Sequence, residues 1–203
     1  LVNDLEQMNH ETESQTEIMR YMASSFDINK NINVIVDAVM DVKHPKLCAV
    51  YLVDTTSSEN KDNIVIRTDY SSMERRLRKD FQKIYTDFAQ SRKMTDIRTG
   101  EDVKEFRFIG EANIRSLAML SLNDVDRPYG MMIVASDDES FFEKGISYYE
   151  TCLIEYNVSV KTTKLYLQTQ DMARKYCLTH IYNRVYFGEL FEKAAEEAKE
   201  KGQ

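Results

Sequence analysis

One long stretch of the chain, from Ile146 to Arg184, contains neither proline nor glycine. Because proline breaks helices and glycine weakens them, this stretch predicts a long helix, and that helix restricts the fold more than any other feature. A helix of about 25 residues within this stretch would be close to 40 Å long, because each residue adds 1.5 Å. That length is more than one small domain covers. We therefore expect part of the helix to pack against a second helix.

Apolar or small side chains in this stretch recur every three or four residues, which is the spacing of a coiled-coil seam. The seam positions are Ile146, Tyr149, Leu153, Tyr156, Val160, Thr163 and Leu167. A second copy of the chain, or a helix expected over residues 1–24, would supply the partner, so the pattern predicts a homodimer through the terminal helices. The alternative is an amphipathic helix lying along its own domain, because the seam becomes polar at Thr163 and Gln170.

Charge and cysteine content limit the classes of partner. The chain has 203 residues and a formal net charge of -7, which disfavours binding to nucleic acid or to an anionic membrane surface. Its three cysteines, Cys48, Cys152 and Cys177, have no spacing typical of a disulfide scaffold or a metal site. No apolar run approaches the roughly 18 residues of a membrane-spanning helix. We expect reduced thiols, no metal or cofactor, no membrane contact and a cytoplasmic location.

Residues 25–142 alternate strand and helix patterns. The stretch LCAVYLVD, residues 47–54, is apolar on both alternating sets and predicts a strand covered on both faces, while residues 64–70 alternate as the second arm of a hairpin. A helix is predicted by the spacing of Met73, Leu77, Phe81, Ile84 and Phe88. Residues 91–114 are expected to form a long irregular functional loop, and two apolar strands follow around the turn DVDRP. This order predicts an α+β fold with an antiparallel sheet flanked by helices.

The passage IRSLAMLSLNDVDRPYGMMIVASDDESFFEKGISYYETCLIEYNVSVKTTKLY resembles the closing pattern of a GAF domain. An Arg-Ser pair heads a strand, a hairpin leads to a glycine that begins the next strand, and a phenylalanine precedes the exit helix. Ser121 departs from the pattern, since many members have proline there. The resemblance implies a GAF-like sensor domain over residues 25–142 and a signalling helix over residues 143–172.

A GAF pocket would lie between the sheet and the irregular segment, with aromatic walls and a few polar groups around a small ligand. The candidate pocket residues are Tyr51, Arg67, Tyr70, Phe106, Phe108, Arg115 and Met119. The alternative is that they are ordinary packing or surface residues. Cys48 lies inside a predicted central strand and is interpreted as a core thiol, not as an attachment point for a chromophore.

Residues 173–203, ARKYCLTHIYNRVYFGELFEKAAEEAKEKGQ, resemble the first part of a GGDEF diguanylate cyclase domain. The positions that match are Leu178, Thr179, Ile181, Asn183, Arg184 and Phe187, whereas Tyr176 stands where the family has aspartate. We expect Asn183 to cap a following helix, and we expect that helix to bury an apolar stripe. The stripe consists of Phe187, Leu190, Phe191, Ala194 and Ala198.

The second resemblance implies that the chain is a piece of a protein that makes cyclic di-GMP from two GTP molecules with Mg²⁺ or Mn²⁺. This chain contains neither a Gly-Gly-Asp/Glu-Glu-Phe string nor a glycine-rich phosphate loop, so we expect it to have no cyclase activity itself. Two hypotheses remain for its own role. It is either a sensor module that binds a small ligand or a constitutive dimerisation module with no ligand.

Overall fold

The computed structural model describes residues 2–53, 63–110, 112–124, 127–143, 145–174 and 181–200. The chain forms two compact units, Leu1–Ser159 and Val160–Gln203, which are described separately. The helices are α1 (Val2–Ser24), α2 (Ile28–Lys43), α3 (Ser71–Ser91), the 3₁₀ helix η1 (Gly100–Glu105), α4 (Ile146–Arg174) and α5 (Arg184–Glu200), and the strands are β1 (Leu47–Leu52), β2 (Asn63–Thr68), β3 (Thr95–Thr99), β4 (Ser116–Asp124) and β5 (Arg127–Ser136).

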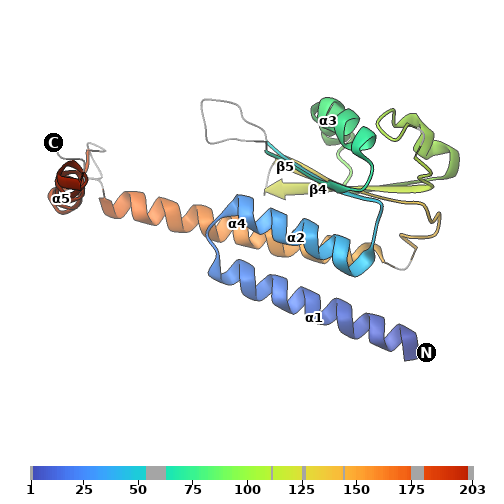
Figure 1. Cartoon of the computed structure of the whole chain (residues 1–203), viewed down its shortest axis with the longest axis horizontal. Coiled ribbons are helices and arrows are strands. Elements are labelled where there is room, and N and C mark those ends of the chain that lie inside the picture. Colours follow the sequence, from blue (N-terminus) through green and yellow to red (C-terminus); the bar gives the residue numbers. More distant parts are fainter. Residues whose placement is uncertain are drawn as a thin grey trace. The chain divides into compact units, whose positions relative to one another are not determined.

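The first unit is built on a five-stranded sheet in the order β2-β1-β5-β4-β3, and every neighbouring pair is antiparallel. Figure 1 shows this sheet nearly edge-on, with α3 on one side and α2 on the other. The strand β1 lies between β2 and β5, with Tyr51 opposite Ile64 on one side and Met131 on the other. Every residue of β1 is buried, as its unbroken apolar pattern predicts. The predicted α+β class with an antiparallel sheet is confirmed.

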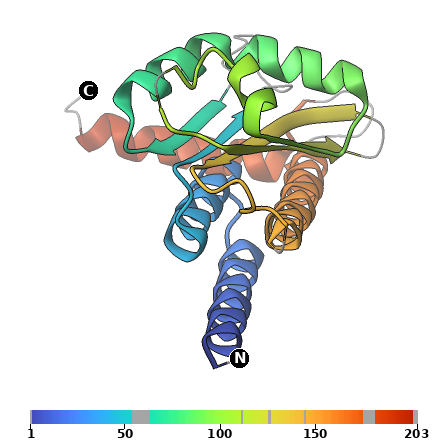
Figure 2. The same cartoon turned by 90° about the vertical axis from the view of Figure 1, so that its right-hand side faces the viewer.

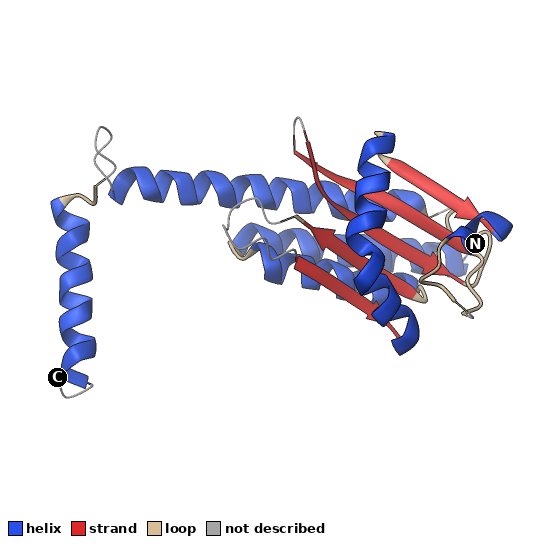
Figure 3. Cartoon of the chain, turned by 90° about the horizontal axis from the view of Figure 1, so that it is seen from above, coloured by secondary structure: helices blue, strands red, loops and turns tan. Residues whose placement is uncertain are grey.

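The two faces of the sheet are covered by different helices. The helix α3 crosses one face, and α2 together with residues 146–159 of α4 lies on the other (Figures 2 and 3). Alternation along β1 sends Tyr51 to the α3 side, where its ring lies 5.4 Å from that of Phe81 and 5.1 Å from that of Tyr85. The hydroxyl of Tyr85 also donates a 2.8 Å hydrogen bond to the carbonyl of Pro128, which fixes α3 to the sheet.

The α2 helix begins and ends with recognisable caps. Asp27 accepts hydrogen bonds from the backbone N–H groups of Asn29 (3.1 Å) and Lys30 (3.0 Å), as expected for an aspartate at the N-cap. His44 takes a left-handed conformation with φ of 49° and donates its N–H to the carbonyl of Met40. Between these caps, the apolar side chains of Ile32, Ile35, Val36 and Val39 are buried.

Residues 95–99 are a strand, so the prediction of one irregular segment over residues 91–114 was wrong at this point. In β3, Asp96 and Arg98 alternate with Thr95 and Ile97, and this edge strand pairs with β4 alone. A short strand with charged residues on one face has none of the apolar signal of β1. Only its pairing with β4 identifies it.

The first half of α4 is covered by its own chain, which corrects the expected dimer seam over that half. Tyr149, Leu153 and Tyr156 are buried, and the hydroxyl of Tyr156 donates to the carbonyl of Ile28 at 3.4 Å. Ile146 is only partly buried. The alternative interpretation, a helix lying along its own domain, therefore describes residues 146–159.

In the second unit, the expected cap of α5 is confirmed. Asn183 accepts a 3.0 Å hydrogen bond from the N–H of Tyr186, while its own side-chain N–H donates to the carbonyl of Ala173 at 2.7 Å. Val160 and Thr163 of α4 are buried, but Leu167 is exposed. Leu178 and Thr179 lie outside the described residues.

The expected buried stripe of α5 is not buried among the described residues. Phe187 and Phe191 are 62% and 68% exposed, and Leu190 is 39% exposed. Arg184, the first residue of the helix, is also exposed. The helix thus has an apolar side with no cover from the described part of the chain.

Candidate ligand-binding cleft

A cleft of about 460 Å³ opens between α3 and the segment that runs from β3 through η1 to the residues that follow it. The α3 wall consists of Asp80, Lys83, Ile84, Asp87, Phe88 and Ser91. These positions are separated by three, one, three, one and three residues, so they lie on one side of the helix. This side combines a partly apolar stripe with three charged residues.

The opposite wall comes from β3 and from the residues just after η1. Asp96 and Arg98 stand two residues apart in β3 and therefore share a face of the strand, together with Met119, which is opposite Asp96 in β4. Phe106 and Phe108 complete the apolar part, and their ring centroids are 5.8 Å apart. The cleft thus has an apolar floor between charged rims, as small-molecule sites do.

Asp96 is less exposed than the two cations beside it, with 13% of its side chain exposed against 50% for Lys93 and 33% for Arg98. Its carboxylate accepts hydrogen bonds from Nζ of Lys93 at 2.7 Å and from Nε of Arg98 at 2.9 Å. Partial burial disfavours the ionised carboxylate, but the hydrogen bonds from Lys93 and Arg98 outweigh burial and hold the pKa of Asp96 below its usual range. The same contact raises the pKa of Arg98. The three side chains form a fixed ionic group with one surplus positive charge.

Two other cations of the cleft have no such ion pair in the part of the chain that the structure describes. Lys83 and Arg107 are exposed, and neither forms an ion pair or a side-chain hydrogen bond with the described residues. Four carboxylates and four cations line the cleft, so its net charge is zero. Within the described ranges, no group of three histidine, cysteine, aspartate or glutamate residues is arranged to hold a metal ion.

Three of the candidate pocket residues line the cleft, namely Phe106, Phe108 and Met119. Tyr51 lies deeper, in the core beneath α3, where its ring contacts Phe81 and Tyr85. Tyr70 is exposed just before α3 begins. The structure brings the first three together and leaves these two outside the cleft.

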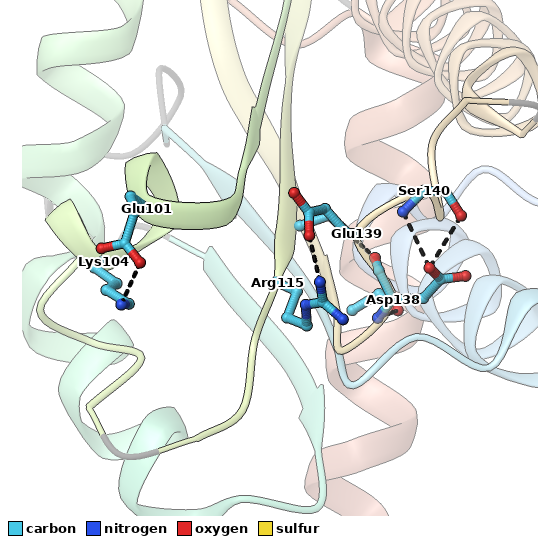
Figure 4. Close-up of polar contacts among 8 residues, drawn as sticks. Glu101, Lys104, Arg115, Asp138, Glu139 and Ser140 are labelled. Atoms are coloured by element: carbon cyan, nitrogen blue, oxygen red, sulfur yellow. Dashed lines mark hydrogen bonds and ion pairs between the residues drawn. The ribbon is translucent and has the colours of Figure 1, made fainter.

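Arg67 and Arg115 lie away from the cleft. Arg67 is opposite Cys48 in the β1–β2 pair, and alternation sends it to the α2 side, where it donates to Asp37 at 2.8 Å and to Asn33 at 3.0 Å. Arg115, just before β4, forms an ion pair with Glu139 (Figure 4). Both positions therefore correct the expectation that these arginines face a pocket.

The charged residues of the cleft are the ones that the sequence analysis did not identify. Asp80, Lys83 and Asp87 lie between the apolar positions whose spacing predicted the α3 helix. Asp96 and Arg98 belong to the segment that was expected to be irregular. Ile97 between them is 41% exposed, so the segment has no apolar pattern that would predict a strand.

The two cysteines among the described residues are both buried, away from the cleft. Burial raises the pKa of Cys48, and the neighbouring Cys152 adds to this shift. Burial raises the pKa of Cys152 to about 12, against a smaller lowering by its hydrogen bond with Tyr148. Neither thiol has the exposure or the thiolate character of a nucleophile. Cys177 lies outside the described residues.

No protein-family model and no curated protein matches the chain. Solved structures do match it in fold. The free methionine-R-sulfoxide reductase of Neisseria meningitidis, in complex with its substrate, is 14% identical, with a TM-score of 0.57 over 77% of this chain and 91% of that one. The GAF domain of a phosphoenolpyruvate-protein phosphotransferase from Acinetobacter is 16% identical, with a TM-score of 0.52 over 77% and 96%.

A putative GAF sensor protein of Burkholderia vietnamiensis is 13% identical, with a TM-score of 0.54 over 80% of this chain and 94% of that one. These likenesses show a GAF-like fold, which agrees with the resemblance inferred from the sequence. They provide no evidence for a GGDEF domain. Among the described helices, none is both long and apolar enough to span a membrane.

Proposed function

We propose that the first unit is a regulatory module that binds a small molecule in the cleft beside α3. The observation that carries this proposal is the cleft itself, where charged groups surround an apolar floor made by Phe88, Phe106 and Met119. Burial of apolar surface gives affinity, and a few polar groups give orientation. The proteins of similar fold include GAF domains and a reductase in complex with its substrate, which supports the same role.

A catalytic role for this module is the less favoured candidate. Reduction of a sulfoxide by a protein thiol requires an accessible thiolate, whereas Cys48 and Cys152 are buried with raised pKa values. We therefore propose binding without chemistry in the described part of the chain.

A thermal-shift screen with nucleotides, amino acids, short peptides and carboxylates tests the binding role. A ligand that binds the folded state must raise its apparent stability. The Lys83→Glu variant changes one wall of the cleft, and Lys79→Glu on an exposed part of the same helix is its control. A shift that Lys83→Glu changes and Lys79→Glu preserves supports the cleft. The absence of any stabilising compound contradicts the proposal.

We also propose that the chain forms a homodimer through a different stripe of α4 from the one expected. Val158, Leu165 and Met172 are exposed and stand seven residues apart, and exposed Ile154 lies four residues before Val158. A seven-residue repeat on an exposed helix fits pairing with the same stripe of a second copy. A dimer that is insensitive to every ligand would favour the alternative role, a constitutive dimerisation module.

Sedimentation equilibrium tests this dimer. Leu165→Glu places a charge in the stripe, whereas Gln170→Glu adds the same charge on the opposite side of the helix. We expect the first variant to weaken association at least tenfold and the second to leave it unchanged. Equal association of both variants and the parent chain would overturn the proposal.

Finally, we propose that residues 173–203 begin an output domain of the diguanylate cyclase class. Support comes from the sequence pattern, from the Asn183 cap of α5 and from exposed Phe187 and Phe191, which the rest of such a domain would cover. GTP and Mg²⁺ or Mn²⁺ would act in that part. The full protein should make cyclic di-GMP from GTP, and this chain alone should not. A full protein without a GGDEF-type hairpin downstream would contradict the proposal.

A further inference from the structure

The distribution of charge in the cleft indicates which class of ligand it binds, an inference that rests on the proposed binding role. On α3, Asp80 and Asp87 flank Lys83, which leaves this wall with a net charge of -1. None of the three forms an ion pair within the described residues. The α3 wall therefore offers two free carboxylates to a positively charged group.

The opposite wall has the opposite sign. Lys93, Arg98 and Arg107 face only Asp96 and Glu105, which leaves a net charge of +1. Arg98 is bonded to Asp96 and also interacts with Glu105, so its charge is largely compensated. Arg107 has no partner among the described residues. Its planar guanidinium matches the geometry of a carboxylate and can donate two parallel hydrogen bonds.

Between the charged walls lies the apolar floor. Phe106 is partly exposed and supplies the accessible part of this floor, while Phe108, which is fully buried, and Phe88 and Met119, each 5% exposed, are fixed by packing around it. A ligand with a cation at one end, a carboxylate at the other and apolar groups between them would satisfy both walls and cover the floor.

We propose that the cleft binds a short zwitterionic peptide, a dipeptide with apolar side chains. Its ammonium group would pair with one of the two α3 carboxylates, Asp80 or Asp87, which stand two helical turns apart, and its carboxylate would face Arg107. Two residues of extended chain reach about 7 Å, close to the roughly 8 Å edge of a cube with the volume of the cleft. A free amino acid carries both charges on one carbon, so it is too short to reach the two walls at once.

Other classes of ligand fit less well. A nucleotide would bring phosphate charge against Asp80, Asp87 and Glu105, and the chain has no glycine-rich phosphate loop. A wholly apolar ligand would desolvate the charged walls without pairing them, which costs free energy. The presence of both negative and positive walls therefore disfavours nucleotides and wholly apolar ligands alike.

Titration calorimetry on the intact chain tests the assignment with dipeptides that carry leucine, methionine and phenylalanine side chains. Each dipeptide is compared with its N-acetyl form, its C-terminal amide and the free amino acid. We expect the unmodified dipeptide to bind at least tenfold more tightly than each of these. Equal binding of the blocked forms would overturn the proposal, because neither charged end of the dipeptide would then contribute to its affinity.

Variants assign each end of the ligand. The double variant Asp80→Asn/Asp87→Asn should lose the preference over the N-acetyl form, and Arg107→Gln should lose the preference over the amide. Asp69→Asn and Arg75→Gln change exposed residues outside the cleft and should keep both preferences. If the preferences persist in the cleft variants, the assignment fails.

The two proposals fail in different ways. If no dipeptide binds but another compound gives a shift that Lys83→Glu abolishes, the binding role stands and the dipeptide proposal is wrong. If no compound of any class binds, both are wrong.

Discussion

The carboxylate of Asp96 accepts a 2.9 Å hydrogen bond from Nε of Arg98, two residues along the same edge strand. Lys93, just before the strand, donates to the same carboxylate at 2.7 Å. These contacts hold two of the four cations of the cleft, Lys93 just before β3 and Arg98 within it, in fixed positions. A ligand therefore meets a wall whose charges are already ordered, which lowers the conformational entropy lost on binding.

The Asp96→Asn substitution should destabilise the first unit in a pH-dependent way. The pKa of Asp96 is lower in the folded state than its unfolded value of about 3.9, so its contribution is present above that pH and is lost as pH falls through the folded pKa. Because Lys93 and Arg98 are partly exposed, we expect a loss of only about 1 kcal/mol at pH 7. Urea unfolding at pH 7 and at pH 2.5–4 measures it.

The difference between the parent chain and Asp96→Asn should shrink as pH falls through the folded-state pKa of Asp96, because the aspartic acid then becomes neutral as well. The Asp69→Asn control, at an exposed bend, should leave stability within about 0.5 kcal/mol at every pH. A difference that is constant with pH would show that the ion pairs with Lys93 and Arg98 do not cause the loss.

Cys48 and Cys152 should resist thiol reagents while the chain is folded. Burial raises the pKa of Cys152 to about 12, from an ordinary 9.0, so its thiolate fraction at pH 8 is lower by about a thousandfold. The shift for Cys48 has the same direction and the same main cause. In a Cys177→Ser background, Ellman's reagent should modify both thiols in guanidinium and neither in native buffer within minutes. Fast modification of the native chain would contradict the packing.

The sequence predicted those elements of the fold whose burial leaves a periodic pattern. An unbroken apolar run identified β1, and the spacing of Met73, Leu77 and Phe81 identified the core side of α3, where all three are buried. The strand β3 was missed because an edge strand with charged side chains needs no apolar pattern. Its partner β4 supplies the stability that its own sequence does not encode.

The site was predicted only in its apolar part, from Phe106, Phe108 and Met119. Arg67 and Arg115 were plausible polar groups, but each has a nearer carboxylate, Asp37 and Glu139, on another segment. Pairings between distant segments depend on the fold and leave no mark in local spacing. For the same reason the buried side of α4 was assigned to a partner chain, when the sheet and α2 already cover its first half.

The Asn183→Ala substitution should loosen the start of α5. It removes the acceptor of the Tyr186 N–H and the donor to the carbonyl of Ala173, and loss of an asparagine cap costs about 1 kcal/mol. Hydrogen exchange of the amides in residues 184–190 should become about fivefold faster. Gln168→Ala, at an exposed position of α4, is the control and should leave these rates unchanged. Unchanged exchange in Asn183→Ala would show that the cap does not stabilise α5.

Two glycine-to-alanine substitutions should have opposite effects. Gly130 lies in β5 between Leu52 and Leu122, and a Cβ atom there would stand 2.4 Å from the carbonyl oxygen of Tyr51. Because that oxygen belongs to the backbone of a central strand, it cannot move aside cheaply. We expect Gly130→Ala to destabilise the first unit by about 2–3 kcal/mol.

Gly188 is exposed within α5, and a Cβ atom there would meet nothing within 4 Å. Alanine should therefore stabilise the helix by about 0.5–1 kcal/mol, since glycine loses more backbone entropy in a helix. Urea unfolding measures the first change, and helical circular dichroism with hydrogen exchange of residues 184–200 measures the second. If Gly130→Ala left the free energy of unfolding unchanged, the close contact between β5 and the backbone of β1 would not restrict this position. If Gly188→Ala destabilised α5, another surface would have to cover this position of the helix.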